Sequence, residues 1–342
     1  MLTVELDYPL PPEAVAQTPV EPRHTSRLLD TRTFTHRTFL ELADLLEAGD
    51  LLVVNRTRVR AARLRGVKVG TGGRVEALVI RRLSAERWEA LLRPARRLRP
   101  GVVLQFGSLR AEVVSGPAGG VAVLELSGRG EVEMLVEEEG EVPLPPYIHR
   151  SLDDPERYQT VFASRLGSSA APTAGLHFTN RVLEALAGKG VERTEIDLEV
   201  GWATFRPIGT ERIEDHPMGV EQFRLPAEAA AAVERCRARG GRVVAVGTTV
   251  VRTLESCASW GGLVTAREGQ TRLYVTPGYR FRVVDLMITN FHAPRSSLLA
   301  LVWAFMGEGW RKAYRTAVEH GYRFLSFGDA MLAERDPRMG RE

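Results

Sequence analysis

Cysteine is scarce in this chain of 342 residues, which contains only Cys236 and Cys257. The two cysteines form no CxxC motif, and no histidine–cysteine pair has the spacing of a zinc site. A disulfide scaffold and a thiolate metal site are therefore not expected, and a reducing environment fits the composition.

Long apolar runs are also missing from the sequence. The longest, Leu298–Met306, falls far short of the roughly 18 residues that a membrane-spanning helix needs. The first ten residues, MLTVELDYPL, lack the basic start and the apolar core of a signal peptide. These features predict a cytoplasmic protein with no membrane partner, and we expect it to be a monomer.

Several common catalytic motifs do not occur in the sequence. It has no phosphate-loop lysine motif, no GxGxxG, no GxSxG and no HExxH. The sequence therefore lacks the motifs that usually indicate nucleotide hydrolysis, dinucleotide redox chemistry, serine hydrolysis or zinc proteolysis.

Positive charge is concentrated in one part of the chain, although the formal net charge is only +3. Residues 56–99 include fourteen arginines or lysines and three glutamates. A positive field of this kind attracts polyanions such as nucleic acid, although a solvated strand face explains the charge alone equally well. The run RPARRLRPG is more specific, because two prolines frame a tight cationic loop. The predicted RNA-binding residues are Arg56, Arg58, Arg93, Arg96, Arg97 and Arg99.

The hydrophobic pattern divides the chain into two kinds of structure. Residues 61–149 consist of short alternating runs separated by Gly, Pro or Ser, which predict an inserted small antiparallel β-barrel domain. The insertion ends at PLPPYIHR, which is typical of a stiff extended linker. In the flanking sequence, helix-like runs such as TNRVLEALAGKG alternate with strand-like runs. We therefore expect residues 1–60 and 150–342 to form one discontinuous α/β domain.

The segment from Asp285 to Met306 joins two apolar runs through a polar cluster. Such runs predict a buried strand followed by a buried helix, and α/β proteins bind ligands at junctions of this kind. The serines of the cluster are explained equally well as helix caps, but caps do not explain the other polar residues. The cluster consists of Thr289, Asn290, His292, Arg295, Ser296 and Ser297.

A second junction has the same form. RVVAV, at residues 242–246, is typical of a buried strand, and Gly247, Thr248, Thr249 and a helix-like run follow it. Two such junctions predict one pocket that is built from both.

Three further segments combine polar residues with apolar flanks. They contain His177, Glu199, and the pair His216 and Glu221, any of which could act as an acid, a base or a ligand. These segments are also explained without a functional role, as a glycine-rich turn, as packing of the core, or as residues exposed to solvent.

Ten motifs in the same order resemble one family, the S-adenosylmethionine:tRNA ribosyltransferase-isomerases of queuosine biosynthesis. They include LLVVNRTRVRAARLRG, PLPPYIHR, APTAGLHF, VGTTVVRTLES and DLMITNFHAPRSSLLALVWAF, and the match runs through nearly the whole chain. The resemblance implies an α/β domain that carries a Greek-key β-barrel insertion, in agreement with the hydrophobic pattern.

The resemblance also implies a reaction. S-adenosylmethionine would be the co-substrate and would donate a ribosyl group, and the acceptor would be the aminomethyl group of 7-aminomethyl-7-deazaguanine at the wobble position of tRNA. The products would be epoxyqueuosine-tRNA, adenine and methionine. Such a reaction needs a base beside the sulfonium, a donor to the leaving adenine and a contact for the methionine carboxylate. The resemblance thus implies that the protein uses no metal and no prosthetic group.

Carried over residue by residue, the resemblance implies acid or base roles for His177, His292 and Glu255. It implies carboxylate or phosphate contacts for Arg252 and Arg295, since guanidinium groups bind such anions bidentately. It implies hydrogen bonds to the ribose or the methionine tail for the side chains of Thr248, Thr249, Asn290, Ser296 and Ser297.

The chain departs from the family pattern at several positions. Glu199 and Gly219 stand where the family often has histidine, and Arg56 stands where Asp or Asn is usual. Histidines that are missing here cannot be indispensable in an active chain, which favours His177 and His292 as the acid and base.

Two other interpretations stay open. An S-adenosylmethionine-dependent RNA methyltransferase would release no adenine, and the glycine-rich strand and loop usual for that class is not evident. A non-catalytic RNA-binding protein would use the arginine-rich barrel, but it would leave the polar junctions unexplained.

Overall fold

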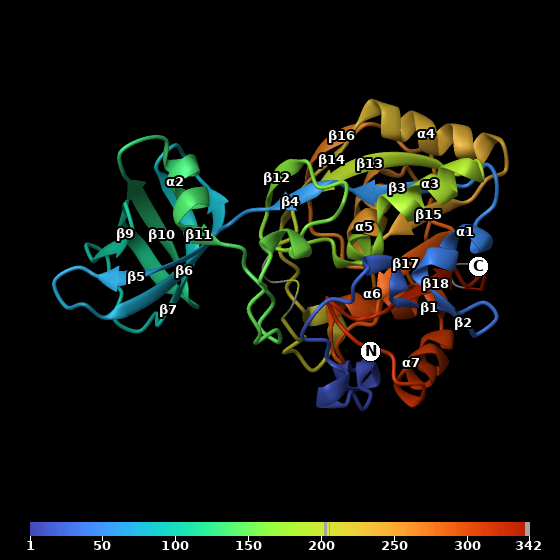
Figure 1. Ribbon diagram of the computed structural model, residues 1–342, viewed down its shortest axis with the longest axis horizontal. Helices are drawn as coiled ribbons and strands as arrows, with labels where there is room; N and C mark the ends of the chain where they lie inside the picture. The colour runs from blue at the N-terminus through green and yellow to red at the C-terminus, as the bar shows by residue number, and fades with distance from the viewer. Residues whose placement is uncertain (202–203, 205, 339–342) are drawn as a thin grey trace. The chain divides into compact units, whose positions relative to one another are not determined.

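The computed structural model describes residues 1–201, 204 and 206–338. The chain forms two compact units (Figure 1). The first consists of Met1–Arg58, Pro145–Leu166 and Ala171–Glu342, and the second of Val59–Leu144 and Gly167–Ala170. The second unit is therefore an insertion in the sequence of the first. That it is a separately folding domain, expected over residues 61–149, stays a prediction.

The second unit is built around a closed antiparallel β-barrel. Its strands follow one another in the order β5-β6-β7-β10-β9-β8, and β8 also pairs with β5, which closes the ring. Because β8 returns to lie beside β5 after the β5-β6-β7 meander, these four strands form a Greek key. The elements are β5 (Arg63–Lys68), β6 (Arg74–Arg82), β7 (Arg87–Arg93), β8 (Val103–Phe106), β9 (Leu109–Ala118), β10 (Val121–Ser127), α2 (Val132–Glu139) and β11 (Gly140–Glu141).

Alternation of side chains along the strands fills the barrel. In β6, Val75, Ala77 and Val79 are buried, whereas the residues between them are partly or fully exposed. The same core contains Trp88 and Phe106, which are almost fully buried. The apolar residues that recur at every second position therefore share one interior.

The first unit contains a mixed sheet of nine strands in the order β16-β14-β13-β3-β15-β17-β18-β1-β2. The strands β13, β3, β15 and β17 run parallel to one another. Central runs such as LLVVN and VVAV are buried throughout, as parallel strands covered on both faces require. The strands are β1 (Arg27–Asp30), β2 (Thr35–Thr38), β3 (Leu51–Asn55), β13 (Glu192–Leu198), β14 (Glu221–Leu225), β15 (Val243–Val246), β16 (Arg267–Thr271), β17 (Leu286–Asn290) and β18 (Ala330–Glu334).

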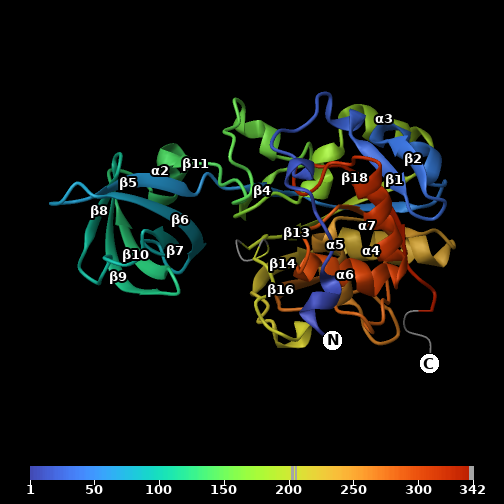
Figure 2. The same ribbon diagram turned by 90° about the horizontal axis from the view of Figure 1, so that it is seen from below.

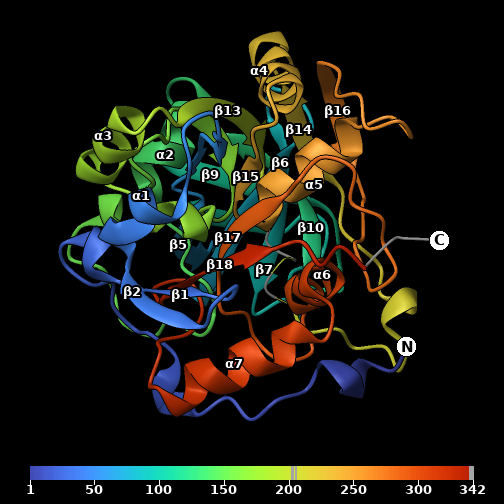
Figure 3. The same ribbon diagram turned by 90° about the vertical axis from the view of Figure 1, so that its right-hand side faces the viewer.

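Helices cover both faces of this sheet. Figure 3 shows α1 and α3 on one side and α4, α5 and α6 on the other, and Figure 2 shows the sheet between α3 and α5. Leu52, Val54 and Val246 pack into the core beneath α1 and α3. The α-helices of this unit are α1 (Leu42–Leu45), α3 (Asn180–Gly188), α4 (Ala227–Ala238), α5 (Thr248–Cys257), α6 (Ser297–Met306) and α7 (Gly309–Glu319).

Short elements complete the described chain. Two short strands, β4 (Thr57–Val59) and β12 (Arg165–Ser168), pair with each other. The 3-10 helices are η1 (Thr3–Leu6), η2 (Pro12–Ala14), η3 (Arg23–Thr25), η4 (Phe39–Glu41), η5 (Pro155–Tyr158), η6 (Thr173–His177) and η8 (Ile213–Asp215). In the described part of the chain, no helix has both the length and the apolar character of a membrane span.

The expected fold class, an α/β domain with an inserted small antiparallel Greek-key β-barrel, is confirmed. Because β3, β15 and β17 are parallel, their carboxyl ends at Asn55, Val246 and Asn290 lie along the same edge of the sheet. Open α/β sheets bind ligands at this edge.

Gly66 in β5 allows the barrel to close. A Cβ atom at this position would lie 2.0 Å from the backbone oxygen of Gln105 on β8. We therefore expect Gly66→Ala to weaken the β5–β8 pairing and to lower the free energy of unfolding by about 1–3 kcal/mol, the range of overpacking substitutions. Chemical denaturation followed by circular dichroism measures the change. Gly73→Ala is the control, because its Cβ would meet only Thr71 Oγ1 at 3.7 Å. Equal stability of the two variants would contradict this expectation.

Candidate functional site

Four side chains form a hydrogen-bonded chain at the carboxyl end of β17. Thr173 Oγ1, at the start of η6, donates to Asn290 Oδ1 at 3.0 Å. Asn290 Nδ2 lies 3.2 Å from His177 Nε2, and His177 Nδ1 lies 2.7 Å from Ser26 Oγ. Because Thr173 donates to the amide oxygen, the amide nitrogen faces His177 as a donor. This places the imidazole proton on Nδ1.

His177 is an uncharged imidazole. Burial, together with the positive charges of Arg323 and Arg23, lowers its pKa to about 3. The ring stacks on Phe39 with the ring centroids 5.0 Å apart. At neutral pH the ring is therefore unprotonated and can accept a proton.

His292 lies just beyond β17 and is uncharged because it is also buried. Burial lowers its pKa to about 3. Its Nε2 atom lies 2.9 Å from Thr289 Oγ1, and its backbone N–H donates to the Tyr314 hydroxyl at 3.0 Å. Neighbouring residues of a strand point to opposite faces. The end of β17 thus presents Asn290 on one face and Thr289 on the other.

Asn290 and His292 line a common cavity of about 60 Å³, here called the edge cavity. Its walls come from segments that are far apart in the sequence, and they include Tyr147, Thr173, Thr204, Pro207, Ser296, Leu298, Leu325 and Ser326. The Tyr147 hydroxyl lies 2.6 Å from Ser326 Oγ, and burial raises the pKa of Tyr147. This phenol therefore stays protonated and can serve as a hydrogen-bond donor.

His177 faces a neighbouring pocket that is lined by Arg23, Ser26, Arg157 and Ser326. Ser326 lines both this pocket and the edge cavity. The structure therefore brings His177, Asn290 and His292 to one edge of the sheet, and their catalytic roles stay a prediction.

The remaining residues of the β17–α6 junction hold the backbone in place. Ser296 Oγ accepts from Leu299 N at 3.2 Å and donates to Ala293 O at 2.7 Å, which is the geometry of a helix N-cap. Ser297 is buried in the first turn of α6. Arg295 has a φ of 53°, and its exposed guanidinium pairs with Asp7. The cap explains Ser296 fully, while Ser297 and Arg295 stay candidates for ligand contacts.

The β15–α5 junction lies beside the end of β17. Gly247, the N-cap of α5, has a φ of 86°, and its N–H donates to Ile288 O at 2.7 Å. Thr248 and Thr249 are buried in the first turn of α5. Neither threonine is among the residues that line the edge cavity. The expected single pocket from both junctions is therefore lined mainly by the β17–α6 side.

Arg252 of α5 has an internal partner. Its Nη1 atom donates to Glu221, and its Nε atom donates to Leu273 O at 3.0 Å. Burial lowers the pKa of Arg252 to about 10, so the group stays charged at neutral pH. Glu221 Oε1 also accepts from Gly201 N and Thr204 Oγ1, both at 3.2 Å. The buried pair thus fixes a wall of the edge cavity, and the expected ligand contact of Arg252 stays a prediction.

Glu255 holds a loop of the α/β unit. Its carboxylate accepts the backbone N–H groups of Arg282, Val283 and Val284 at distances of 3.0–3.2 Å. Burial raises its pKa, whereas the hydrogen bonds from these N–H groups lower it. It is not among the residues that line the edge cavity. This geometry favours a structural role over the expected acid or base role, since its loss would leave three N–H groups unpaired.

Two of the predicted RNA-binding arginines lie in the first unit and form ion pairs. Arg56 Nε and Nη2 donate to Asp197 at 2.8 and 3.2 Å, and Arg58 pairs with Glu156. The Arg56 side chain is 29% exposed, and its contact with RNA stays a prediction.

The other four lie in the second unit, where Arg93 ends β7 and the remaining three lie in the segment that joins β7 to β8. Leu98 is buried in the barrel core and anchors this segment. The exposed cationic side chains are Arg93, Arg96, Arg97 and Arg99. Within the described residues, none of these four forms an ion pair, and their contact with RNA stays a prediction.

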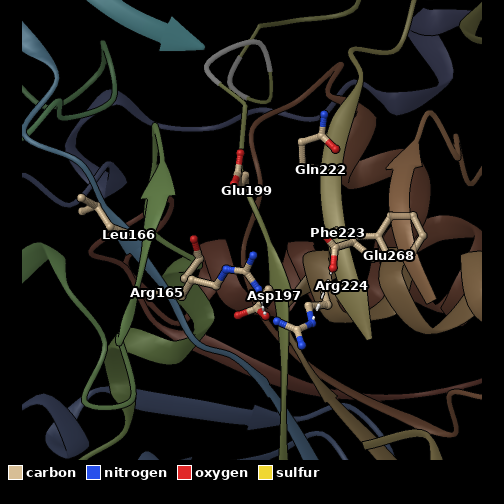
Figure 4. A pocket seen from close by; sticks show the side chains of 9 residues that line it. Arg165, Leu166, Asp197, Glu199, Gln222, Phe223, Arg224 and Glu268 are labelled. Atoms are coloured by element: carbon tan, nitrogen blue, oxygen red, sulfur yellow. Dashed lines mark hydrogen bonds and ion pairs between the residues drawn. The ribbon is translucent and has the colours of Figure 1, made fainter. Parts of the chain in front are cut away.

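A second pocket, here called the sheet-face pocket, has a volume of about 220 Å³ (Figure 4). It lies on the face of β13, β14 and β16, and residues near β4 and β12 complete it. Its lining consists of Thr57, Arg165, Leu166, Asp197, Glu199, Gln222, Phe223, Arg224 and Glu268.

The sequence alone did not single out several of these residues. Tyr147 belongs to PLPPYIHR, which was expected to be only a linker, and Ser26 and Ser326 lie in segments without regular periodicity. The only signal for them was their place in motifs that resemble the family. Across residues 1–201, 204 and 206–338, no group of three or more His, Cys, Asp or Glu side chains could hold a metal ion.

Comparison with known proteins identifies close relatives. The family model described as "Queuosine biosynthesis protein" matches residues 3–333. The S-adenosylmethionine:tRNA ribosyltransferase-isomerase of Moorella thermoacetica is 51% identical over 336 residues, which cover 96% of this chain and 98% of that protein. The protein of the same name from Heliobacterium modesticaldum is also 51% identical, over 95% of this chain and 98% of its own length.

A solved structure is similar as well. The crystal structure of S-adenosylmethionine tRNA ribosyltransferase from Thermotoga maritima is 38% identical to this chain, with a TM-score of 0.55. The match covers 96% of this chain and 99% of that one.

The two uncharged histidines make stability depend on pH. An unfolded histidine has a pKa of about 6.5, whereas His177 and His292 have values of about 3 in the folded chain. Between these values the unfolded chain binds more protons, so the free energy of unfolding falls as the pH is lowered from about 6.5 toward 3. We expect His177→Asn to reduce the slope in this window by up to about 1.4 kcal/mol per pH unit. Urea unfolding at several pH values measures it. The exposed His320→Asn is the control, and identical slopes for all three proteins would refute the expectation.

Proposed function

This chain belongs to the queuosine biosynthesis protein family, and we propose on that basis that it is an S-adenosylmethionine:tRNA ribosyltransferase-isomerase. It transfers the ribosyl group of S-adenosylmethionine to the aminomethyl group of 7-aminomethyl-7-deazaguanine at the wobble position of tRNA and isomerises it. The products are epoxyqueuosine-tRNA, adenine and methionine.

One observation supports placing the reaction at the carboxyl edge of the central strands. Two uncharged imidazoles, His177 and His292, lie on either side of β17, and Asn290 connects His177 to the edge cavity. Proton transfer needs a base in its unprotonated form, and burial keeps both rings in that form at neutral pH.

We place the reacting part of S-adenosylmethionine in the edge cavity. The sulfonium acidifies the neighbouring C5′ hydrogens, and His292 removes one of them as a proton. The electron pair left on carbon drives the loss of adenine, which leaves with a proton. The neutral amine of the acceptor then attacks, and methionine departs. Asn290, Thr173 and Ser326 supply hydrogen bonds to the adenine and the ribose.

The volume of the edge cavity, about 60 Å³, holds only part of S-adenosylmethionine. The methionine tail therefore extends beyond it, where Arg295, Ser297, Thr248 and Thr249 are the candidate contacts. Arg295 is the sharper candidate for the carboxylate, since its guanidinium is half-exposed and pairs only with an exposed Asp7 among the described residues.

The partners that follow from this proposal are tRNA and S-adenosylmethionine. Neither a metal nor a prosthetic group takes part in the steps above. A cytoplasmic location and a monomeric state complete the proposal.

Adenine release tests the proposed reaction directly. We expect the protein to release free adenine from S-adenosylmethionine when tRNA carrying the aminomethyl base is present, measured by chromatography. S-adenosylhomocysteine as the product would instead indicate a methyltransferase, and the absence of either product would indicate a binding protein.

The role of His292 has its own test. We expect His292→Ala to reduce adenine release at least about 100-fold, since general-base groups contribute about 10²–10⁴-fold. Affinity for tRNA should change little, because the ring lies in the edge cavity. His320→Ala is the control, since His320 is exposed on the first unit. Wild-type turnover of the His292 variant would exclude this ring as the base.

The cationic loop between β7 and β8 is the proposed RNA contact of the second unit. We expect replacement of Arg96, Arg97 and Arg99 by Glu to weaken tRNA binding and to flatten its dependence on salt, by about one unit of slope for each phosphate that is no longer neutralised. Fluorescence anisotropy across a salt titration measures both effects. The control is Arg110→Glu, at an exposed position of β9. Unchanged isotherms for the triple variant would show that this loop does not contact the RNA.

A further inference from the structure

The floor of the sheet-face pocket consists of two rows of polar side chains. One row is Asp197, Arg224 and Glu268, which pair directly across β13, β14 and β16. The next row begins with Glu199, whose backbone N–H donates to Gln222 O at 2.9 Å. Residues two apart on a strand point to the same face, so the two rows lie about 7 Å apart on one face of the sheet.

The Asp197 row is the donor-rich end of the pocket. Asp197 accepts from Arg165 at 2.9 Å and from Arg56 at 2.8 Å, so two guanidiniums share one carboxylate. Arg224 approaches Glu268 only to 3.7 Å. Figure 4 shows Asp197 between the guanidinium groups of Arg165 and Arg224. Each guanidinium carries five N–H donors in a rigid fork, so this end retains donors for an anionic oxygen.

The Glu199 row is the acceptor-rich end. Glu199 lies farther along β13, with Gln222 across from it on β14 (Figure 4). An ionised carboxylate only accepts hydrogen bonds, and the amide adds a second accepting oxygen. The apolar side chain of Leu166 lines the same pocket and offers a surface to a flat ring.

We propose that the sheet-face pocket binds the acceptor nucleotide of the RNA, with its phosphate at Arg165 and Arg224 and its base at Glu199. This inference rests on the proposed function and names the site of its second substrate. A guanine-type base presents adjacent N–H donors at its pairing edge, and its aminomethyl group is attached to the opposite edge, so these acceptors do not hold it. Such a base matches the acceptor-rich end, and its phosphate matches the donor-rich end, which lies about 7 Å away.

The methionine end of S-adenosylmethionine is the competing occupant, because it also carries a positive and a negative group. Its ammonium and carboxylate are attached to the same carbon atom, however. They are too close together to span two rows that lie about 7 Å apart. A nucleotide separates its anionic and donor groups by the sugar, which suits this spacing better.

Glu199→Gln tests the base contact, because it removes the charge and keeps the shape. We expect the KM for tRNA carrying the aminomethyl base to rise about tenfold or more, which corresponds to about 1.4 kcal/mol, while the KM for S-adenosylmethionine stays unchanged. Binding without S-adenosylmethionine, measured by anisotropy, should lose its preference for tRNA with guanine over tRNA with adenine at the wobble position. Arg224→Gln should weaken the binding of both RNAs equally, because a contact to phosphate does not depend on the identity of the base.

Glu319→Gln, an exposed change on α7, is the matched control, and melting temperatures show whether each variant is folded. An unchanged KM and an unchanged preference in folded Glu199→Gln would overturn the proposal. A rise in the KM for S-adenosylmethionine instead would assign the pocket to the methionine end. If the wild type releases no adenine, the proposed function fails, and the binding comparison of the two RNAs still decides whether this pocket reads the base.

Discussion

Parallel pairing of β3, β15 and β17 is the constraint on which the candidate site depends. It places Asn55, Gly247 and Asn290, which are far apart in the sequence, at one edge of the sheet. The hydrogen bond from Gly247 N to Ile288 O fixes two of these junctions against each other. The turn that follows β17 positions His292 and Ser296 in the lining of the edge cavity. The sheet therefore acts as the rigid support of the site, and the chemistry belongs to the turns.

The buried ionisable groups around this edge differ in the partners that they have. The carboxylate of Glu221 accepts from Arg252 and that of Glu255 accepts from backbone N–H groups, so both side chains hold parts of the fold in place. His177 and His292 have no such counter-charge and stay neutral. A sulfonium substrate adds positive charge, which a neutral imidazole tolerates better than an imidazolium. The environment thus keeps both rings uncharged at neutral pH.

The sheet-face pocket and the edge cavity share one structural support. Glu221 fixes Gly201 and Thr204, while Gln222 beside it lines the sheet-face pocket. Because neighbouring residues of β14 face opposite sides of the sheet, one strand serves a buried ion pair and an open polar pocket. A single strand therefore supports both a wall of the edge cavity and the floor of the sheet-face pocket.

The sequence alone predicted the barrel strands and the buried parallel strands, because these features depend on local periodicity. Alternating apolar residues, as in Val75, Ala77 and Val79, indicate a barrel strand wherever they occur, and the run VVAV indicates a buried parallel strand. The polar cluster at Asn290 and His292 was visible for the same reason. The resemblance to a family added the reaction, which no periodicity contains.

Tertiary structure alone decided which partner each polar side chain meets. The sequence offered Glu255 and Arg252 as site residues, yet their partners lie 27 and 31 positions away and hold the fold. It treated the segment with Tyr147 as a linker, although Ser326, 179 positions away, joins that tyrosine to the edge cavity. Periodicity records whether a residue is buried, because burial follows the geometry of one element. The identity of a hydrogen-bond partner depends on how separate elements pack, and a one-dimensional pattern does not contain that information.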